Sequence, residues 1–403
     1  MNASRPAGYS LCPLLFVAFL TGPAAAVQRY TITDLGARPD FPISQARAIN
    51  ASNQIVGTLY DTSQTQARAF LYSVATMTLL NPTATMTAQA INDDGQIVGA
   101  AIAGTGTSHA FAYTAGITAD LFTLGGTTSY ALGINSDGLI CGASTTGDGF
   151  THAFVYDGGV MYDIHVLAQA TEYSSPNPTT NIVQSTFSQA QDVNNTREVV
   201  GYFTAPDAGG TSTERAFFYK NEQMLELGSL GGANSRVLAT SNNGHIVGWS
   251  QNAAGVQFAA MFYTNGQVRS LGMPTTTATW SAAYDVNDSG VVVGSADGVA
   301  FVYTNATTTN LNTLIPSDTP WSLLSATGIN NAGRIVGYGT ISGQTHAFML
   351  TPTFVSTAPS DDSTDTSYPH AGCGTGAGVP LALATLYMLA TSLPGLSNRL
   401  RRR

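Results

Sequence analysis

Charged residues are scarce in this chain of 403 residues, and lysine is almost missing. Asp, Glu, Lys and Arg make up 10% of the sequence, with 24 acidic against 15 basic side chains, and Lys220 is the single lysine. Proteins bind nucleic acids by neutralising phosphates with Lys and Arg, and an acidic chain repels those phosphates. Nucleic acid is therefore excluded as a partner.

Cysteine is equally rare, with copies at positions 12, 141 and 373 only. Three thiols cannot build the paired disulfide framework that stabilises small secreted domains. Cys141 stands between Ile140 and Gly142, and we expect it to be a small buried hydrophobe. The stability of the fold must therefore come from packing and from closure of its sheets.

Recognisable catalytic motifs are missing as well. The chain has no nucleophile elbow, no His-Glu-x-x-His, no phosphate-binding loop and no pair of cysteines at metal-ligand spacing. Asp192, Asp285 and Glu172 are scattered acids, and the sequence does not show whether they converge. We predict no catalytic residue, no metal site and no cofactor, and an enzyme with acids on one face of the fold stays open as the alternative.

Both ends of the sequence carry targeting features. Residues 1–26 predict a secretory signal peptide, because an apolar run is followed by the small side chains Ala24 and Ala26 at the cleavage position. Residues 356–376 are polar and predict a disordered linker. Residues 377–398 form an uncharged span long enough to cross a bilayer, and residues 399–403 form an Arg cluster on the cytoplasmic side.

The C-terminal tail allows two interpretations. A bare membrane anchor needs only the apolar span, whereas this tail also holds Gly372, Cys373 and Gly374. The order of Cys, apolar span and Arg cluster resembles the Cys-containing C-terminal sorting tails of Gram-negative bacteria. That resemblance implies a sorting protease that cuts near Cys373 and leaves the protein attached to the cell surface.

Between these ends, one phrase is written seven times. It reads Ile/Val-Asn (Thr-Ser in one copy), a short Asp/Asn/Gly-rich turn, and then Ile/Val-Val-Gly (Ile-Cys-Gly in one copy). Its closing glycine recurs every 42 to 47 residues, apart from one stretched interval between Gly142 and Gly201. Periods of this length are typical of stacked or radial repeats. The copies end at Gly57, Gly99, Gly142, Gly201, Gly248, Gly294 and Gly337.

Each repeat predicts four antiparallel strands. The phrase itself is a tight hairpin, since Asp-Gly and Asn-Gly turns supply positive φ. An alternating aromatic segment follows as a third strand, at residues 68–72, 109–113, 152–156, 215–219, 260–263, 299–303 and 346–350. A short fourth strand ends the unit. Four-stranded units at a fixed period predict an all-β, seven-bladed β-propeller over residues 27–355, and the hairpins argue against a parallel β-solenoid.

The two ends of this body suggest how the ring closes. The last repeat stops after its third strand at Leu350, and an unpaired fourth-strand segment, Tyr30 to Gly36, precedes the first repeat. We expect the N-terminal strand to complete the last blade, because closure removes the exposed edges of an open sheet.

The third strand carries a further signature, His-Ala-Phe, at His109, His152 and His346. Together with the Leu-Gly-x-Leu-Gly-Gly element at residues 227–232, it resembles the HAF-repeat family of extracellular bacterial proteins. The resemblance covers nearly the whole body and implies no established reaction, cofactor or catalytic residue. These histidines recur once per blade, so we expect them to be architectural and not to converge on a metal, whose ligands lie about 2 Å from one ion.

The turn asparagines are also expected to be architectural, because Asn can bond its own backbone two residues further on. A calcium interpretation of residues 92–95 or 287–290 stays open, although these loops are shorter than usual calcium sites.

Departures from the period direct attention to one face. The longest insertions, residues 168–188 and 204–213, belong to connections that share a face of a propeller, where function is concentrated. Trp249, Trp280 and Trp321 are placed by the sequence in connections of the same kind, and their rings suit stacking on sugars. Filling gaps between blades is the alternative role for these tryptophans.

The sequence therefore predicts a secreted protein, displayed on the cell surface or anchored to the membrane through its C-terminal helix. We expect a binding or adhesion module for an extracellular ligand or polysaccharide. The alternative is an extracellular hydrolase or lyase with acidic residues on the loop-rich face.

Overall fold

The computed structural model describes residues 27–102, 106–173, 185–207 and 209–355. The chain divides into two compact units, residues 1–357 and 358–403, and all described residues belong to the first. The predicted signal peptide, linker, apolar span and Arg cluster lie outside the described residues, as do Ala24, Ala26, Gly372, Cys373 and Gly374. Within the described part of the chain, no helix is long and apolar enough to cross a membrane.

The first unit is built from short antiparallel strands, with one α-helix and one short 3-10 helix among its described residues. Five sheets have four strands each. These are β2 (Ile43–Ile49), β3 (Ile55–Tyr60), β4 (Ala67–Ser73) and β5 (Thr76–Leu79); β6 (Met86–Ile91), β7 (Ile97–Ile102), β8 (Ser108–Thr114) and β9 (Ile117–Asp120); β18 (Gly231–Thr240), β19 (Ile246–Asn252), β20 (Gln257–Phe262) and β21 (Val268–Ser270); β22 (Ala282–Val286), β23 (Val292–Ala296), β24 (Val299–Thr304) and β25 (Thr307–Asn310); and β26 (Trp321–Ile329), β27 (Ile335–Ile341), β28 (Gln344–Val355) and β1 (Val27–Gly36).

The sixth sheet has eight strands. Its strands are β10 (Gly125–Ile134), β11 (Ile140–Thr146), β12 (Thr151–Asp157), β13 (Val160–Asp163), β14 (Phe187–Val193), β15 (Val199–Pro206), β16 (Ser212–Lys220) and β17 (Gln223–Glu226). Helix α1 (Ile164–Tyr173) follows β13, and the 3-10 helix η2 (Leu311–Thr313) follows β25. One parallel pair, Thr151 with Phe187, joins β12 to β14 and so merges two repeats into this sheet.

The prediction of seven separate four-stranded blades is therefore wrong. Among the described residues, five four-stranded sheets stand alone and the remaining eight strands share one sheet. The merger falls in the stretched interval between Gly142 and Gly201, where a parallel pair between Thr151 of β12 and Phe187 of β14 joins two repeats. The sequence period predicts the number of hairpins, but it does not predict where a strand of one repeat pairs with a strand of the next.

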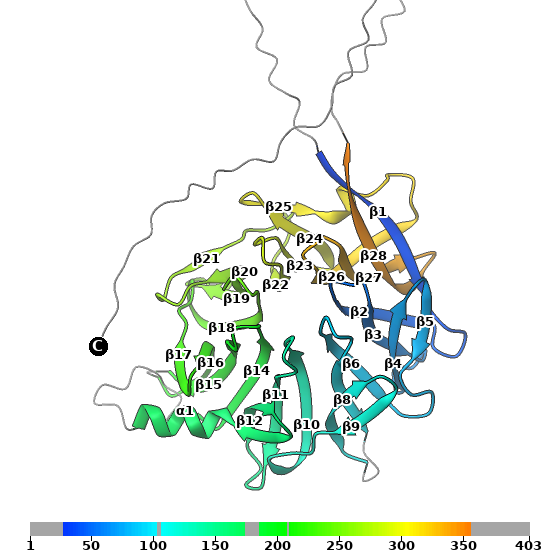
Figure 1. The fold of residues 1–403 in the computed structure, drawn as a ribbon. Coiled ribbons are helices and arrows are strands. Elements are labelled where there is room, and N and C mark those ends of the chain that lie inside the picture. The colour runs from blue at the N-terminus through cyan, green and yellow to red at the C-terminus, as the bar shows by residue number, and fades with distance from the viewer. Residues whose placement is uncertain (1–26, 103–105, 174–184, 208, 356–403) are drawn as a thin grey trace, which may run out of the picture. The chain divides into compact units, whose positions relative to one another are not determined.

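The first strand of each repeat lies nearest the centre of the ring. Figure 1 shows β2, β6, β10, β14, β18, β22 and β26 around a common centre, with the later strands of each repeat further out. The expected closure is present, since β1 pairs with β28 from Val27–Val355 to Gly36–Ala347 and completes the sheet of β26, β27 and β28. Each inner strand is therefore held at a fixed place around one axis.

The apolar core lies between neighbouring sheets and not at the centre. In one cluster, Phe70 and Ile49 of the first repeat pack with Val336 and Ala347 of the last. The phrase glycine makes this packing close: a Cβ on Gly57 would lie 2.1 Å from the backbone oxygen of Gln45 and 2.7 Å from the Phe70 ring. The closing glycine of the phrase is thus required by close approach and not by its dihedral angles.

One repeat breaks this pairing of glycine and phenylalanine. The sequence pattern aligns Phe262 with the phenylalanines of the other third strands, but the register pairs Gly248 with Ala260. Phe262 instead pairs with Ile246 and takes the place that Tyr72 has in the first repeat. The motif is displaced by two residues, which preserves the inward face because strand side chains alternate with a period of two.

The turn asparagines tie consecutive repeats together. The Asn50 side-chain oxygen accepts a hydrogen bond from the Gln54 backbone N–H, as expected for a turn. Its Nδ2 also donates to the backbone oxygen of Asn92, one repeat further on, at 3.0 Å. The same inter-repeat bond is donated by Asn92, Asn135, Asn194, Asn287 and Asn330.

This chain of amide bonds returns to its start, because Asn330 donates to the backbone oxygen of Asn50. Ser241 has no amide group, and at that place Asn243 Nδ2 donates to the backbone oxygen of Asp288 instead. The sequence predicted the turn function of these residues but not the bond to the next repeat, which Asn can make because it accepts and donates at once.

Candidate ligand site at the centre of the ring

A β-bulge interrupts the pairing of every inner strand at the same place, three residues before the turn Asn or Ser. In β2 the register passes from Ala46 to Ala48 and leaves Arg47 without a partner residue. Bulges re-aim side chains and often occur next to functional sites. The seven unpaired residues are Arg47, Gln89, Leu132, Gln191, Leu238, Tyr284 and Thr327.

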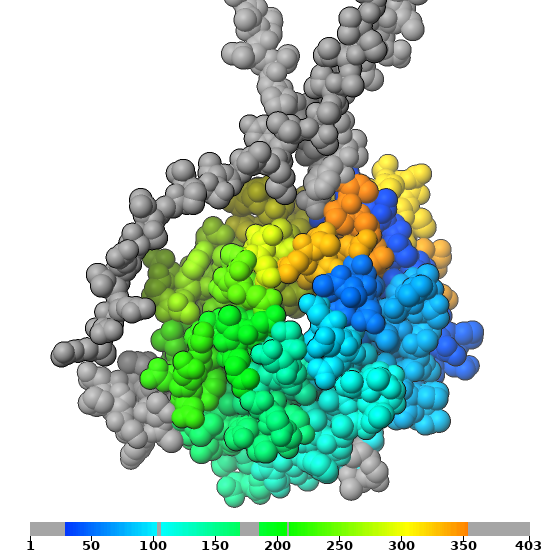
Figure 2. Space-filling model, viewed as in Figure 1, coloured from blue at the N-terminus to red at the C-terminus, as the bar shows by residue number. Residues whose placement is uncertain are grey.

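These seven residues, together with Ser325 and Tyr338, line an axial cavity of about 310 Å³. The space-filling view shows an opening at the middle of the ring (Figure 2). Each repeat thus contributes at least one side chain to a single cavity, and the last repeat contributes three. The backbone bulge is the same in every repeat, whereas the side chain at the bulge differs between most repeats.

Arg47 is the one charged side chain of this lining. Its Nη2 lies 3.4 Å from Gln45 Oε1, and its Nε is a buried nitrogen with no hydrogen-bond partner among the described residues. Tyr284 stands in the same lining with its hydroxyl 3.4 Å from Ser295 Oγ, and burial raises the pKa of that hydroxyl. The lining therefore combines one cation, amide groups, hydroxyls and two tyrosine rings.

Two carboxyls lie directly behind this lining. Asp192 and Asp285 follow the bulge residues Gln191 and Tyr284, at a position where the other repeats carry Ala or Gly. Asp285 accepts hydrogen bonds from the backbone N–H groups of Val286 and Ile329, at 2.8 Å each. Asp192 does the same with Val193 and Thr240. Each carboxyl thus bridges its own inner strand to that of the following repeat.

Burial in protein raises the pKa of both carboxyls, to about 6 for Asp192 and about 7 for Asp285. The negative charge of Asp192 adds to the rise at Asp285, and the backbone N–H bonds oppose it. These two residues were among the scattered acids of the sequence. The structure places them at equivalent positions around one axis, where their charges interact.

A smaller hollow of about 170 Å³ lies on the side of the hairpin turns. Its lining includes Asn50, Asp93, Asn242, Asp288 and Asn331. The carboxylates there already accept backbone hydrogen bonds, from Ala51 to Asp93 and from Asn242 to Asp288. Within the described residues, no group of three or more His, Cys, Asp or Glu side chains is arranged to hold a metal ion.

The three predicted tryptophans lie away from the axial cavity, and none belongs to its described lining. Trp249 is inside strand β19 and not at the start of a connection, with the Arg236 guanidinium 5.5 Å from its ring centre. Trp321 begins β26 and packs edge-on against Phe348 at 6.0 Å. Trp280 lies in the connection between β21 and β22 and is half-buried.

The two long insertions are neighbours, as expected, because Phe187 pairs with Thr204. Their local structure differs from the loops that the sequence indicated. The first begins within helix α1, whose Val166 N–H is capped by Asp163 at 3.0 Å. The second is largely a longer hairpin, in which β15 and β16 stay paired as far as Pro206 and Ser212. An Asp before an apolar segment was the available sign of the helix.

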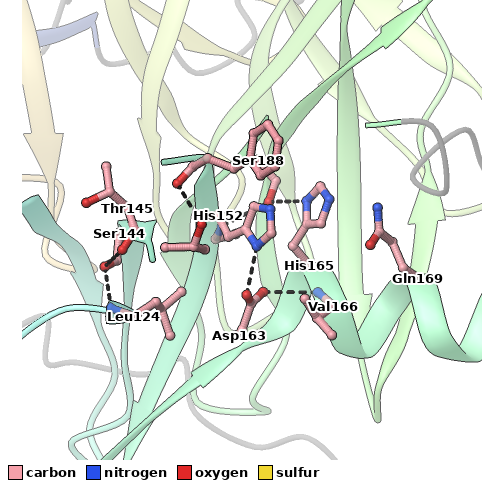
Figure 3. Close-up of polar contacts among 12 residues, drawn as sticks. Leu124, Ser144, Thr145, His152, Asp163, His165, Val166, Gln169 and Ser188 are labelled. Carbon is pink, nitrogen blue, oxygen red and sulfur yellow. Dashed lines mark hydrogen bonds and ion pairs between the residues drawn. The ribbon is translucent and has the colours of Figure 1, made fainter. Parts of the chain in front are cut away.

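The histidines of the His-Ala-Phe signature each contact an acid on the adjacent fourth strand. His109 Nδ1 lies 2.9 Å from Asp120, His152 Nδ1 lies 2.7 Å from Asp163 (Figure 3), and His346 Nδ1 lies 3.1 Å from Asp34 across the ring closure. Arg215 and Glu226 form the same pair in another repeat. In three of these four pairs the acid stands eleven residues after the His or Arg, which was the sequence signal for the pairing.

His165 adds a second histidine to one of these pairs, with its ring stacked on His152 at 4.1 Å (Figure 3). His165 Nε2 lies 3.1 Å from the Ser185 backbone oxygen, so it is the donor, and Nδ1 accepts from Ser188 Oγ at 2.7 Å. Burial, aided by His152, lowers the pKa of His165 to about 4. Ser188 and His165 are fully buried, so this serine and histidine tie strands together and have no room for a substrate.

Comparison with solved structures decides the fold. The β-propeller domain of the Trilobed protease from Pyrococcus furiosus, which has an open velcro topology, is 9% identical and covers 79% of this chain and 100% of its own, with a TM-score of 0.52. This chain folds as a β-propeller. Streptogramin B lyase is also similar, at 12% identity and a TM-score of 0.46, with coverage of 80% of this chain and 98% of its own.

These likenesses concern the fold of the propeller alone, because the sequences are so different. No protein-family model matches the chain, and no curated protein sequence matches it either. In this propeller the first and last described strands are paired with one another. Function must be argued from its own residues.

Proposed function

We propose that this protein is a secreted propeller of the cell surface that binds a carbohydrate chain end in its axial cavity. The observation that carries the proposal is the mixed lining of that cavity, to which every repeat contributes its bulge residue. Its volume of about 310 Å³ falls at the lower end of ligand pockets and suits roughly one or two sugar rings. The resemblance to HAF-repeat proteins and the predicted signal peptide support an extracellular place for this role.

The chemistry of the lining suits hydroxyl-rich ligands. Gln89, Gln191 and Thr327 offer both donors and acceptors, whereas Arg47 offers donors only. Tyr284 and Tyr338 provide rings against which the apolar face of a sugar packs. The free Nε of Arg47 is a buried donor that a ligand oxygen would satisfy, and this favours a sugar that carries a carboxylate or several hydroxyls.

The test is binding of the full-length protein to a panel of acidic and neutral oligosaccharides, followed by calorimetry on the best ligand. Arg47→Ala is expected to weaken binding at least tenfold, because it removes the cavity's single cation. Arg38→Ala removes the same charge at an exposed site and serves as the control. Equal affinity for Arg47→Ala and the unaltered protein would refute the axial site.

The tryptophans offer a separate location for the same activity. Trp280 is half-buried in a connection, and Trp280→Ala removes a ring without disturbing the edge-on contact that Trp321 makes with Phe348. Loss of glycan binding in Trp280→Ala but not in Arg47→Ala would move the site from the cavity to the loop-bearing face.

An extracellular hydrolase or lyase is the second candidate, and Asp192 and Asp285 favour it. Carboxyls with raised pKa values behind a cavity are suited to proton transfer. Incubation of the best-binding oligosaccharide with the protein, followed by product analysis, separates the two functions. Turnover that is lost in Asp285→Ala would establish catalysis, and intact ligand after long incubation would support binding alone.

A further inference from the structure

A second groove, distinct from the axial cavity, lies where the repeat period is stretched. It measures about 320 Å³ and opens between β12 and β13 on one side and β15 and β16 on the other. Helix α1 borders it through Leu167. The groove is as large as the axial cavity, and it exists at the one place where two repeats share a sheet.

Arg197 stands in this groove with an unfavourable backbone. Its φ is 61°, in the left-handed region, at the turn position where five other repeats carry Gly and the first repeat carries Asn53. A long side chain costs about 1 kcal/mol or more in that region, and such strain is concentrated at functional sites. Arginine at this glycine position places a guanidinium in the lining of the groove.

The guanidinium of Arg197 contacts Asp157, forty residues earlier, with Nη2 to Oδ2 at 2.5 Å. Both side chains are about half exposed, at 51% and 47%, so this ion pair contributes little to stability. A ligand carboxylate can therefore compete for the guanidinium, which binds carboxylates through two parallel hydrogen bonds. Arg197 and Asp157 then offer one cation and one anion to the same small molecule.

The rest of the groove adds a second acid and an apolar floor. Glu222 lines it, in the turn between β16 and β17. Leu139, Val155 and Val199 supply aliphatic surface, and Tyr162 has 45% of its surface exposed beside them. The groove thus presents a cation, two carboxylates and an apolar surface together.

We propose that this groove binds a free amino acid or dipeptide with an apolar or aromatic side chain. Its carboxylate would take the guanidinium of Arg197, its ammonium would lie between Asp157 and Glu222, and its side chain would cover the aliphatic floor beside Tyr162. A zwitterion is the class of ligand that matches both signs of charge in one groove. This site is independent of carbohydrate binding at the axis.

The test uses the full-length protein and four probes in calorimetry or ligand-observed NMR. L-phenylalanine and L-leucine are expected to bind, whereas N-acetyl-L-phenylalanine and L-phenylalaninamide each lose one charge and are expected to bind at least tenfold more weakly. Glu222→Gln is expected to weaken the binding of L-phenylalanine three- to tenfold.

Arg197→Gly is the decisive variant, because it restores the residue of the other turns. It is expected to abolish binding while the thermal unfolding midpoint stays equal or rises, since backbone strain is relieved. Arg197→Asn, which introduces the residue type found at Asn53, repeats the test, and Arg334→Ala removes a charge near another turn as the control. Absence of binding by both amino acids, or unchanged binding in Arg197→Gly, would overturn the proposal.

Discussion

Asp285 shows how one residue can make a propeller sensitive to pH. Its pKa in the folded protein is about 7, against 3.8 for the ordinary side chain, because burial disfavours the charged form. The folded state therefore binds this proton more tightly than the unfolded chain does. Between about pH 4 and pH 7 the free energy of unfolding falls as pH rises, and above pH 7 the full cost is present.

His165 acts in the opposite direction. Its pKa is lowered from 6.5 to about 4. As the pH drops below 6.5, the histidine is therefore protonated in the unfolded chain while it stays neutral in the folded protein. Stability from this group is complete above pH 6.5 and is lost towards pH 4. The two groups therefore partly cancel across the same range in the unaltered protein.

Replacement of Asp285 by Ala separates these effects, and Ala48 and Ala90 show that the position accepts alanine. The variant loses two accepted hydrogen bonds at every pH, so it is expected to be less stable at pH 4. Because the pKa of Asp285 is about 7 in the folded protein and 3.8 ordinarily, the difference from the unaltered protein should shift in favour of the variant by about 4 kcal/mol between pH 4 and pH 8. Urea unfolding at both pH values measures it, and a difference independent of pH would contradict a raised pKa for Asp285.

At the scale of the element, the inner hairpin depends on glycine for reasons that sequence alone hides. The repeated Ile/Val-Val-Gly was predicted as the second strand of a hairpin, and the register of β2 with β3 confirms it. Most turn glycines have positive φ, whereas Gly57 has an ordinary strand backbone and is instead pressed against Gln45. The recurrence of a glycine in every repeat shows that the position requires glycine. It does not show whether the cause is a positive φ or the close approach of a neighbouring backbone.

Gly57→Ala is expected to destabilise the protein by at least about 3 kcal/mol, because its Cβ would overlap backbone atoms that cannot move away. Gly158→Ala is the matched control, since its Cβ would meet nothing within 4 Å and only its φ of 55° is strained. That control should cost about 1 kcal/mol. Chemical denaturation compares the two, and similar losses would show that close approach is not the constraint.

Patterns within one repeat and the strand missing from the last repeat were predictable, whereas most contacts between repeats were not. The hairpins, the aromatic third strand and the pairing of the two termini follow from period-two alternation and from the strand missing in the last repeat. Helix α1 depends on burial of Ile164 and Ala168 against the neighbouring repeat, and the merged eight-stranded sheet depends on one pair of residues. The axial cavity was missed because the bulge that aims Arg47 inward depends on the pairing of two strands.

For the whole molecule, closure rests on strand β1. Its Tyr30 and Leu35 are buried, with 2% and 5% of their surfaces exposed, and the Tyr30 N–H bonds the Leu314 oxygen at 2.9 Å. Removal of residues 27–36 would expose the edge of β28 and lose roughly 1.5–3 kcal/mol for each large buried side chain. That is a large share of the roughly 5–15 kcal/mol by which domains are stable.

The variant that lacks residues 27–36 is therefore expected to aggregate or to unfold at a midpoint at least about 10 °C lower, as size-exclusion chromatography and calorimetry would show. A synthetic peptide of residues 27–36 should restore part of the midpoint, and a scrambled peptide should not. A monomeric variant with an unchanged midpoint would mean that β1 is dispensable for the ring.

The pairing of Thr31 with Thr351 also determines when the ring can close during synthesis, because 320 residues separate the two partners. Ribosomes add roughly 5–20 residues per second, so β1 is made roughly 15 to 65 seconds before its partner strand exists. Until β28 is made, β1 has no partner strand in its own chain, and strands of other nascent chains can pair with its free edge. Closure of the ring therefore cannot begin until synthesis has reached the last strand.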